Sequence, residues 1–340
     1  MRAVVVHEFG SPEGLSVEEI AAPRPGPHEI LIDVQAVGVN FVDLLVIGGT
    51  YQFLPPRPFT PGKLPAGRVI EVGQNVTQFA VGDRVLTTAE QGGYSEQAVA
   101  LASDSYRIPD SMSFTDAAGM ALAFDTAWFA LRERGRVQAG ETVLVLGATG
   151  AVGLAAIQLA KAWGARVLAG VSSMAKSDIV KAAGADGVVD LSVENLRDGL
   201  RDQVRALTNG RGADVVIDSL GDRFFAAALR AMAWSARLVV VGFAGGEIPS
   251  VKVNYLMLKN IEVSGLQVSD YRKRTPGRMR ECFEEVFSLY EKGIVRAPAI
   301  SVRPLEGFAQ ALAEIRDRKT KERIVLARNA PVSSPKSPEN

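Results

Sequence analysis

Cysteine and histidine are the scarcest reactive side chains in this chain of 340 residues, which has one Cys and two His. A single cysteine excludes an intramolecular disulfide and any cysteine-rich zinc cluster. His7 and His28 lie far from Cys282 in the sequence, so we expect no histidine-ligated catalytic metal. We interpret both histidines as surface residues and predict no metal site.

The single cysteine lies in RMRECFEEVFSLYEKG, where apolar residues recur at helical spacing. The recurring residues are Met279, Cys282, Val286, Phe287 and Tyr290. We therefore interpret Cys282 as a core residue of an amphipathic helix. An unpaired cysteine of this kind favours a reducing, cytoplasmic setting.

An excess of one charge sign is also missing, because 38 Lys+Arg balance 38 Asp+Glu. Zero net charge argues against a strongly basic nucleic-acid-binding protein and gives no attraction to anionic membranes. No apolar run approaches the ~20 residues that a membrane-spanning helix needs, and the start, MRAVVVHEFG, has no signal-peptide pattern. We predict a cytoplasmic protein with no nucleic-acid partner and no membrane association.

What the sequence does contain is enough apolar material, 47% of its residues, for a large core. At about 150 residues per domain the length predicts two domains. Residues 1–122 are rich in short β-branched segments separated by Pro and Gly, which predicts a mostly antiparallel β domain. A helix is expected to start near Ser113, at SFTDAAGMALAF.

From Glu141 onward strand and helix patterns alternate. The candidate strands are ETVLVLG, ARVLAGV, GVVDLS, ADVVIDSLG, ARLVVVGFAGG and IEVSGLQ. Such alternation predicts an α/β domain, a doubly wound parallel sheet covered on both faces, which we place at residues 123–265. We expect residues 266–328 to return to the first domain and the polar segment 329–340 to be a mobile tail.

The most informative stretch is ETVLVLGATGAVGLAAIQLAKAWGA, where a strand, three glycines and a helix follow one another. A pyrophosphate needs bare backbone N–H groups at a helix N-terminus, although the glycine pattern here is G-x-x-G-x-x-G and not G-x-G-x-x-G. The alternative is that the glycines only allow tight strand–helix packing. The predicted cofactor-binding residues are Gly147, Thr149, Gly150, Ala151, Val152 and Gly153.

The cofactor type is predicted from the end of the next strand. A site for NAD usually has Asp or Glu there to bind the ribose 2′-hydroxyl, whereas the 2′-phosphate of NADP needs cations or neutral donors. The segment has no acid but contains Ser172, Ser173 and Lys176, which favours NADPH. The alternative is a surface lysine beside serines that cap a helix.

In the order of its motifs the chain resembles the medium-chain dehydrogenase/reductase superfamily, and within it the zinc-independent quinone oxidoreductase branch. The motifs are GVNFVDLLVIGGTY, PFTPGKLPAGRVIEVG, VGDRV, GGYSEQ, AFDTAWFAL, the glycine loop, VVIDSLG and VVVGFAGG. The resemblance implies a GroES-like β domain formed by both chain ends around a central Rossmann domain, with the active-site cleft between the two domains. It also implies a homodimer that pairs Rossmann sheet edges, here through IEVSGLQV.

The same resemblance addresses metal and site residues. Zinc-dependent members carry Cys at the position of Asn40 and Gly-His-Glu at Gly62, Lys63 and Leu64, so no zinc ligand set is expected. Predicted catalytic residues are Asn40 and Tyr51, as hydrogen-bond donors to an oxyanion, and Asp43. The alternatives are that Asn40 and Asp43 cap a helix start, which is equally compatible for Asp43, and that Tyr51 only packs in a turn. Predicted nicotinamide-side residues are Thr126, Gly242, Phe243 and Ala244.

At three positions the sequence differs from the residues usual in this branch, and these differences affect the predicted substrate and cofactor. Ile47 replaces a usual Arg, Leu64 followed by Pro65 replaces a Glu-like position, and Leu191 replaces a Tyr that contacts the 2′-phosphate. The first two make the predicted cleft less polar. The third weakens the NADPH prediction without reversing it.

The leading functional hypothesis is an NADPH-dependent reductase of a quinone or another conjugated carbonyl (enone). A 2-enoyl-thioester reductase is the alternative, for which a basic stretch could bind the phosphates of a CoA ester. That stretch contains Arg272, Lys273, Arg274, Arg278 and Arg280. A non-catalytic NADPH-binding or RNA-binding protein is the alternative of another class, and the zero net charge gives RNA binding no support.

Overall fold

The computed structural model describes residues 1–320 and 322–330. Its chain forms two compact units, Met1–Leu122 with the chain from Ala297 onward, and Ala123–Arg296. We call these unit 1 and unit 2. The part of the predicted tail after residue 330 lies outside the described residues.

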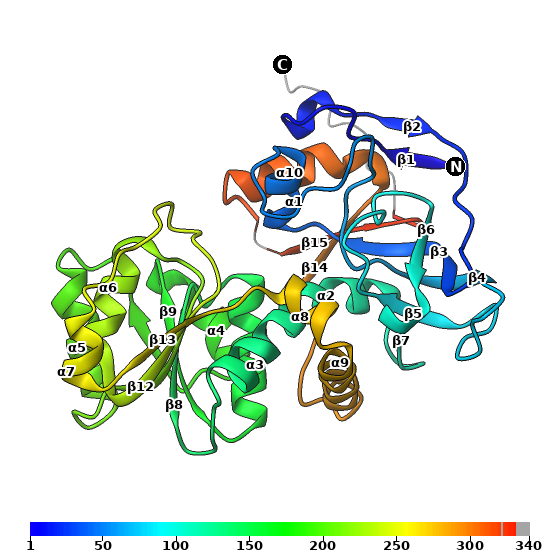
Figure 1. Ribbon diagram of the computed structural model, residues 1–340. Helices are drawn as coiled ribbons and strands as arrows, with labels where there is room; N and C mark the ends of the chain where they lie inside the picture. The colour runs from blue at the N-terminus through cyan, green and yellow to red at the C-terminus, as the bar shows by residue number, and fades with distance from the viewer. Residues whose placement is uncertain (321, 331–340) are drawn as a thin grey trace. The chain divides into compact units, whose positions relative to one another are not determined.

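Unit 1 is built on a mostly antiparallel sheet, as predicted (Figure 1). The strand order is β14-β15-β3-β4-β5-β7, and β6 pairs with β3. The C-terminal strand β15 lies antiparallel to β3, with Leu326 opposite Val37, so both chain ends contribute to the unit. The elements are β1 Arg2–Val4, β2 Val17–Glu19, β3 Glu29–Gly38, α1 Phe41–Ile47, β4 Ala66–Val72, β5 Arg84–Thr87, β6 Gln97–Leu101, β7 Ser105–Arg107, β14 Ile300–Arg303, α10 Phe308–Arg316 and β15 Arg323–Ala327.

Unit 2 is the predicted parallel sheet covered by helices (Figure 1). Its six strands run in the order β10-β9-β8-β11-β12-β13, which is the Rossmann order 3-2-1-4-5-6 along the chain. Its elements are β8 Thr142–Leu146, α3 Ala151–Ala162, β9 Arg166–Val171, α4 Ser177–Ala182, β10 Gly187–Asp190, α5 Leu196–Leu207, β11 Ala213–Asp218, α6 Asp222–Ala231, β12 Met232–Val240, α7 Asn254–Lys259, β13 Glu262–Gly265, α8 Val268–Arg274 and α9 Pro276–Glu291.

Helix α2, Phe114–Phe129, runs through the boundary at residue 122 and continues into the π-helical turn η3, Ala130–Arg134. Its start is the one the sequence predicts, because the Ser113 hydroxyl accepts a hydrogen bond from the Asp116 N–H at 3.0 Å. Short 3₁₀ turns are η1 Pro12–Gly14, η2 Ala102–Asp104, η4 Met174–Lys176 and η5 Leu305–Gly307.

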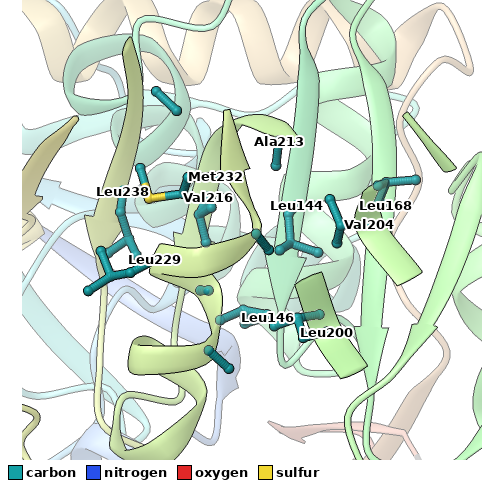
Figure 2. Packing of buried hydrophobic residues seen from close by; sticks show 14 of the residues in the cluster. Leu144, Leu146, Leu168, Leu200, Val204, Ala213, Val216, Leu229, Met232 and Leu238 are labelled. Carbon is teal, nitrogen blue, oxygen red and sulfur yellow. The ribbon is translucent and has the colours of Figure 1, made fainter. Parts of the chain in front are cut away.

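The core of unit 2 explains why its strands are continuous apolar runs. Leu144, Leu146, Val216 and Leu238 from the strands pack against helix residues such as Leu200, and these side chains are fully buried (Figure 2). Strands covered on both faces have no solvent side and therefore lose the alternation of polar and apolar residues.

The second domain boundary differs from the one we expected. Residues 266–296 belong to unit 2 and not to the returning part of unit 1. The reason is a set of contacts that sequence spacing does not reveal: Arg272 of α8 pairs with Asp125 of α2, and Glu285 of α9 accepts hydrogen bonds from Trp128 and Trp163. Cys282 is fully buried on α9, as predicted.

Candidate active site

The glycine loop of unit 2 has a geometry that can hold an anion. It joins the end of β8 to the start of α3, and the Ala148 N–H donates to the Gly170 carbonyl at the end of β9. Gly150 occupies the N-cap position of α3 but has no side chain that could cap the helix, and the first turn contains no acidic residue. The first N–H groups of the helix therefore have no partner from the helix or a cap, which is the arrangement that binds a phosphate.

Two of the three glycines are required by geometry. Gly147 has φ +68°, a left-handed conformation that disfavours other residues. A Cβ on Gly153 would lie 2.5 Å from the Gly147 carbonyl oxygen, so the helix can approach the strand only because Gly153 has no side chain. Gly150 is exposed, with only the Gly147 oxygen near its missing Cβ. Tight packing and an open cradle thus occur together, and a dinucleotide pyrophosphate fits the loop.

The predicted 2′-phosphate residues lie at the end of β9. Ser172 and Lys176 are exposed, and the Ser173 hydroxyl accepts a hydrogen bond from the Ala175 N–H at 3.3 Å. Leu191 is 2% exposed and fills the space above Gly170, where a Cβ would meet it at 3.0 Å. The segment therefore presents one cation, two hydroxyls and no carboxylate.

The predicted nicotinamide-side loop follows β12 and is attached to the turn after β11. The N–H groups of Val241 and Ala244 donate to the carbonyls of Asp218 and Ser219. Phe243, in this loop, is 42% exposed. Because β8, β11 and β12 are parallel neighbours, the predicted residues of the glycine loop and of Gly242–Ala244 follow strand ends on one edge of the sheet.

Asp218 organises this edge and was missed by the sequence analysis. Its Oδ1 accepts the N–H groups of Leu220 and Gly221, each at 2.9 Å, while Oδ2 is buried and has no partner among the described residues. Burial raises the pKa of the carboxyl against the effect of those two hydrogen bonds. The signal available in the sequence is an acid between a buried apolar strand and a glycine, in VVIDSLG.

Thr126 is 6% exposed on α2, beside a buried ion pair. Its hydroxyl donates to Asp125, whose Oδ2 lies 2.6 Å from Arg272; these two side chains are 0% and 3% exposed. Burial raises the pKa of Asp125 although Arg272 opposes the rise. This pair also removes Arg272 from the basic stretch that we considered for CoA phosphates. Arg278 is likewise paired, with Glu133 and Glu281.

The remaining predicted site residues lie in unit 1, where Asn40 and Asp43 share a buried polar cluster. The Asn40 N–H donates to Asp43 Oδ2 at 2.8 Å, and the Tyr94 hydroxyl donates to the same oxygen at 2.9 Å. Burial raises the pKa of Asp43 despite both hydrogen bonds. These contacts are the helix-capping arrangement that was the alternative for Asp43, at the start of α1.

The side-chain amide of Asn40 is oriented by Arg323 of β15. The guanidinium donates to Asn40 Oδ1 at 2.5 Å and to the carbonyls of Val39 and Gly119, while Asn40 Nδ2 donates to the Gly38 carbonyl at 2.8 Å. An amide nitrogen has two hydrogens, so the Gly38 contact leaves one of them for another acceptor.

Lys63 and Tyr51 form the other edge of this cluster. Lys63 is 4% exposed, pairs with Glu90, and has its Nζ 5.2 Å from the centroid of the half-buried Tyr51 ring. The ring of Phe53 lies edge-on to Tyr51, with centroids 6.3 Å apart. The structure thus divides the predicted residues into two groups: Asn40, Asp43 and Tyr51 in unit 1, and Thr126 with all predicted cofactor residues in unit 2.

Neither group offers a site for a metal. Over residues 1–320 and 322–330, no three or more His, Cys, Asp or Glu side chains gather in a way that could hold a metal ion. Zinc therefore does not fit the described donor set. In the same residues, no helix is long and apolar enough to cross a bilayer.

A Rossmann sheet with an uncapped glycine-rich helix start, together with an antiparallel sheet formed by both chain ends, defines a two-domain dehydrogenase or reductase fold. Residues 26–110 match the family described as "Alcohol dehydrogenase GroES-like domain", and residues 151–289 match "Zinc-binding dehydrogenase". The second description names a metal that the donor set found here does not fit.

Whole-chain relatives specify the family. The chain is 37% identical over 329 residues to quinone oxidoreductase-like protein 2 homolog of Nematostella vectensis, covering 96% of this chain and 88% of that protein. The Escherichia coli quinone oxidoreductase complexed with NADPH is similar in structure, with TM-score 0.87, 28% identity, and 96% and 100% of the two chains covered. A mycobacterial protein complexed with NADPH gives TM-score 0.88 and 32% identity over 96% and 100%. The chain belongs to the quinone oxidoreductase-like branch of the medium-chain dehydrogenase/reductase superfamily.

Proposed function

We propose that the protein is an NADPH-dependent, zinc-independent oxidoreductase that transfers hydride to a quinone or another conjugated carbonyl acceptor. The observation that carries the proposal is the uncapped, glycine-lined start of α3 within a Rossmann sheet. Two of the similar structures are complexes with NADPH, which supports the choice of cofactor.

In this proposal unit 2 binds the cofactor. The N–H groups of Ala151, Val152 and Gly153 would receive the pyrophosphate, and Ser172, Ser173 and Lys176 would receive the 2′-phosphate. Thr126 and the loop Gly242–Ala244 would hold the nicotinamide, which supplies a hydride when the cofactor is bound. Asp218 would act on that loop indirectly, because it fixes the turn to which the loop is bonded.

Unit 1 would provide hydrogen bonds to the acceptor. Oxygen gains negative charge as a conjugated carbonyl is reduced, and preorganised donors stabilise that charge. Asn40 would donate the hydrogen of Nδ2 that Gly38 does not receive, and Tyr51 would donate its hydroxyl hydrogen. Asp43 would fix the position of Asn40 by accepting its backbone N–H.

Reduction of an enoyl thioester remains the second reaction to test. Three arginines of the basic stretch that we considered for the phosphates of CoA have partners within the protein. Arg272 pairs with Asp125, Arg278 with Glu133 and Glu281, and Arg274 lies 3.9 Å from Asp270. Arginines held in internal ion pairs are less available to a CoA ester, so these contacts favour a small conjugated carbonyl.

The deciding experiment is an activity matrix. The purified protein is mixed with NADPH or NADH and a quinone, a simple enone or crotonyl-CoA, and absorbance records cofactor oxidation. We expect NADPH oxidation with the quinone or enone at rates well above those with crotonyl-CoA. Calorimetric NADPH binding without turnover of any acceptor would support the non-catalytic alternative instead.

We also propose that the protein forms a homodimer through the edge strand β13. This strand is the last of the unit 2 sheet and its outer backbone groups have no strand partner among the described residues. Large apolar side chains near it in sequence are highly exposed: Ile248 76%, Val253 72%, Met257 71% and Leu258 69%. A second copy of the sheet edge would cover both features.

A further inference from the structure

Lys63 is a cation buried in unit 1 that the proposed catalytic residues do not account for. It is 4% exposed, whereas the Glu90 side chain with which it pairs is 28% exposed. Removing an ammonium group from water is unfavourable, and a buried ion pair often stabilises a protein less than apolar packing would. The stability of the fold does not by itself explain why this position carries a charge.

The residues on both sides of Lys63 have positive φ angles, which is uncommon for the leucine. Gly62 has φ +92°, and a Cβ there would lie 2.3 Å from the Tyr94 ring. Leu64 has φ +54°, an uncommon conformation for a residue with a side chain, and it precedes Pro65. Such strain persists only where the surroundings impose it, and it is concentrated at functional sites.

The surroundings of Lys63 match a planar acceptor that gains negative charge. Its Nζ lies 5.2 Å from the centroid of the Tyr51 ring, and Phe53 is 40% exposed edge-on to that ring. The Lys63 charge also opposes the burial-driven rise in the pKa of Asp43, so it acts on the same cluster that holds Asn40.

The Lys63 ammonium group can donate more hydrogen bonds than its contact with Glu90 uses. In residues 1–320 and 322–330, Glu90 is the hydrogen-bond partner found for Nζ, and an ammonium group has three hydrogens to donate. Glu90 is the less buried member of the pair, so an anion that reaches Lys63 from solvent also meets the Glu90 carboxylate. The anion and the carboxylate then compete for one cation.

We propose that Lys63 is the positive charge of the acceptor site and binds the acceptor oxygen as it becomes an oxyanion. This inference rests on the proposed function. The acceptor carbon gains a hydride from the dihydronicotinamide as a new C–H bond, and the displaced π electron pair moves to the oxygen. Lys63 Nζ holds that oxyanion until a solvent proton neutralises it, and the cofactor is left oxidised. The acceptors that fit are planar conjugated carbonyls whose reduced form is a phenolate or enolate.

The test uses 4-nitrophenol, whose phenolate absorbs visible light, and needs no turnover. The probe is titrated with pH in the presence of the protein saturated with NADP⁺, and again without nucleotide. We expect the wild-type protein to bind the phenolate in preference to the phenol, lowering the apparent pKa of the bound probe. Lys63→Met should weaken phenolate binding about ten- to a hundredfold, the value of one charge-assisted hydrogen bond, and should leave phenol binding unchanged.

Two further variants distinguish charge from structure. Glu90→Gln removes the competing carboxylate and should strengthen phenolate binding, whereas a purely structural ion pair would make this variant as weak as Lys63→Met. Lys63→Arg keeps the charge and should retain most of the preference. Lys292→Met, an exposed lysine at the end of α9, is the matched control. Melting temperatures and NADPH affinities show whether each variant is folded.

The outcome is independent of whether the protein proves to be a reductase. If wild type binds phenol and phenolate equally, or if Lys63→Met does not change the preference, the assignment of Lys63 is wrong even where NADPH reduces a quinone. If the preference depends on Lys63 but no acceptor is reduced, the proposed function fails while the anion site stands.

Discussion

At the scale of single residues, cofactor preference is predicted to depend on Lys176. The side chain is exposed beyond the end of β9, and no acidic residue lies in that segment. We expect Lys176→Ala to weaken NADPH binding about ten- to a hundredfold, the value of one charge-assisted hydrogen bond, with NADH binding unchanged. Fluorescence titration with both nucleotides measures the ratio. Lys181→Ala on α4 is the control, and an unchanged ratio in Lys176→Ala would remove the 2′-phosphate assignment.

Residue identity in the sequence predicts some contacts of this protein and not others. The glycine loop was predictable because the strand, the glycines and the helix are adjacent in the chain. The pair formed by Asp125 and Arg272 was not, because its members are 147 residues apart and each occurs in an ordinary helical pattern. The same is true of Arg323 and Asn40, 283 residues apart. The sequence therefore suggested a basic stretch around Arg272 and Arg278 that could bind phosphates. In the fold, both arginines form ion pairs with acidic side chains of the same unit.

At the scale of elements, the packing of α3 on β8 depends on Gly153. A Cβ there would lie 2.5 Å from a backbone oxygen and 2.7 Å from the Ala148 Cα, neither of which can move easily. We expect Gly153→Ala to lower the free energy of unfolding by about 1–3 kcal/mol and NADPH affinity by at least about tenfold, because the phosphate-binding N–H groups shift with the helix.

Denaturant unfolding and nucleotide titration measure the two effects. The matched control is Gly277→Ala in α9, where a Cβ would meet nothing within 4 Å. That substitution should be neutral or stabilise by up to about 1 kcal/mol, because alanine favours the helix. Equal effects of the two substitutions would contradict the close-packing explanation.

Helix α9 is held to α2 and α3 by Glu285. Its carboxylate accepts hydrogen bonds from the indoles of Trp128 at 2.6 Å and Trp163 at 2.8 Å, and from Arg132 at 3.0 Å. Burial tends to raise the pKa of Glu285, but these donors outweigh it and the pKa lies below its ordinary value of 4.5. Because the native state holds the ionised form, this contribution to stability is present above the ordinary pKa and is lost as the pH falls through the native one.

We therefore expect Glu285→Gln to lower the melting temperature at neutral pH and to flatten its decline in acid. Hydrogen bonds to a charged group contribute about 1.5–3 kcal/mol each before solvent screening. Tryptophan fluorescence should change in parallel, since two of the three Trp residues contact this carboxylate. Glu284→Gln, one position along on the exposed face, should leave both the melting curve and the emission unchanged. If the melting temperature of Glu285→Gln declined in acid as it does in the wild type, the stabilising role of the Glu285 carboxylate would be refuted.

At the scale of the whole molecule, self-association is predicted to depend on the exposed apolar side chains near β13. A Met257→Glu, Leu258→Glu double variant places two charges on this surface and should convert the dimer to monomer in sedimentation velocity. Both side chains are about seven-tenths exposed, so the melting of the isolated subunit should change little. Val81→Glu, at a 66% exposed apolar site of unit 1, is the control and should sediment as wild type. A monomeric wild-type protein would end this proposal.

The domain organisation was predictable in outline, because alternating strands and helices and the late strand around Ile324 are visible in the sequence. The second boundary was not, because it depends on which unit α8 and α9 contact. Amphipathic helices reveal that they have a buried face, but not the partner of that face.

The hydrogen bond between Arg323 and Asn40 also has a consequence in time. A ribosome adds about 5–20 residues per second, so the 283 residues between these partners take roughly 14 to 57 s to synthesise. During that interval Asn40, Val39 and Gly119 lack the guanidinium that later binds them, and the edge of β3 that will pair with β15 is open. Unit 2 lies between the two parts of unit 1 in the sequence, so its synthesis is complete before the C-terminal part of unit 1 has been made. The nascent chain thus passes through a stage in which unit 2 is complete while the sheet of unit 1 still lacks β15.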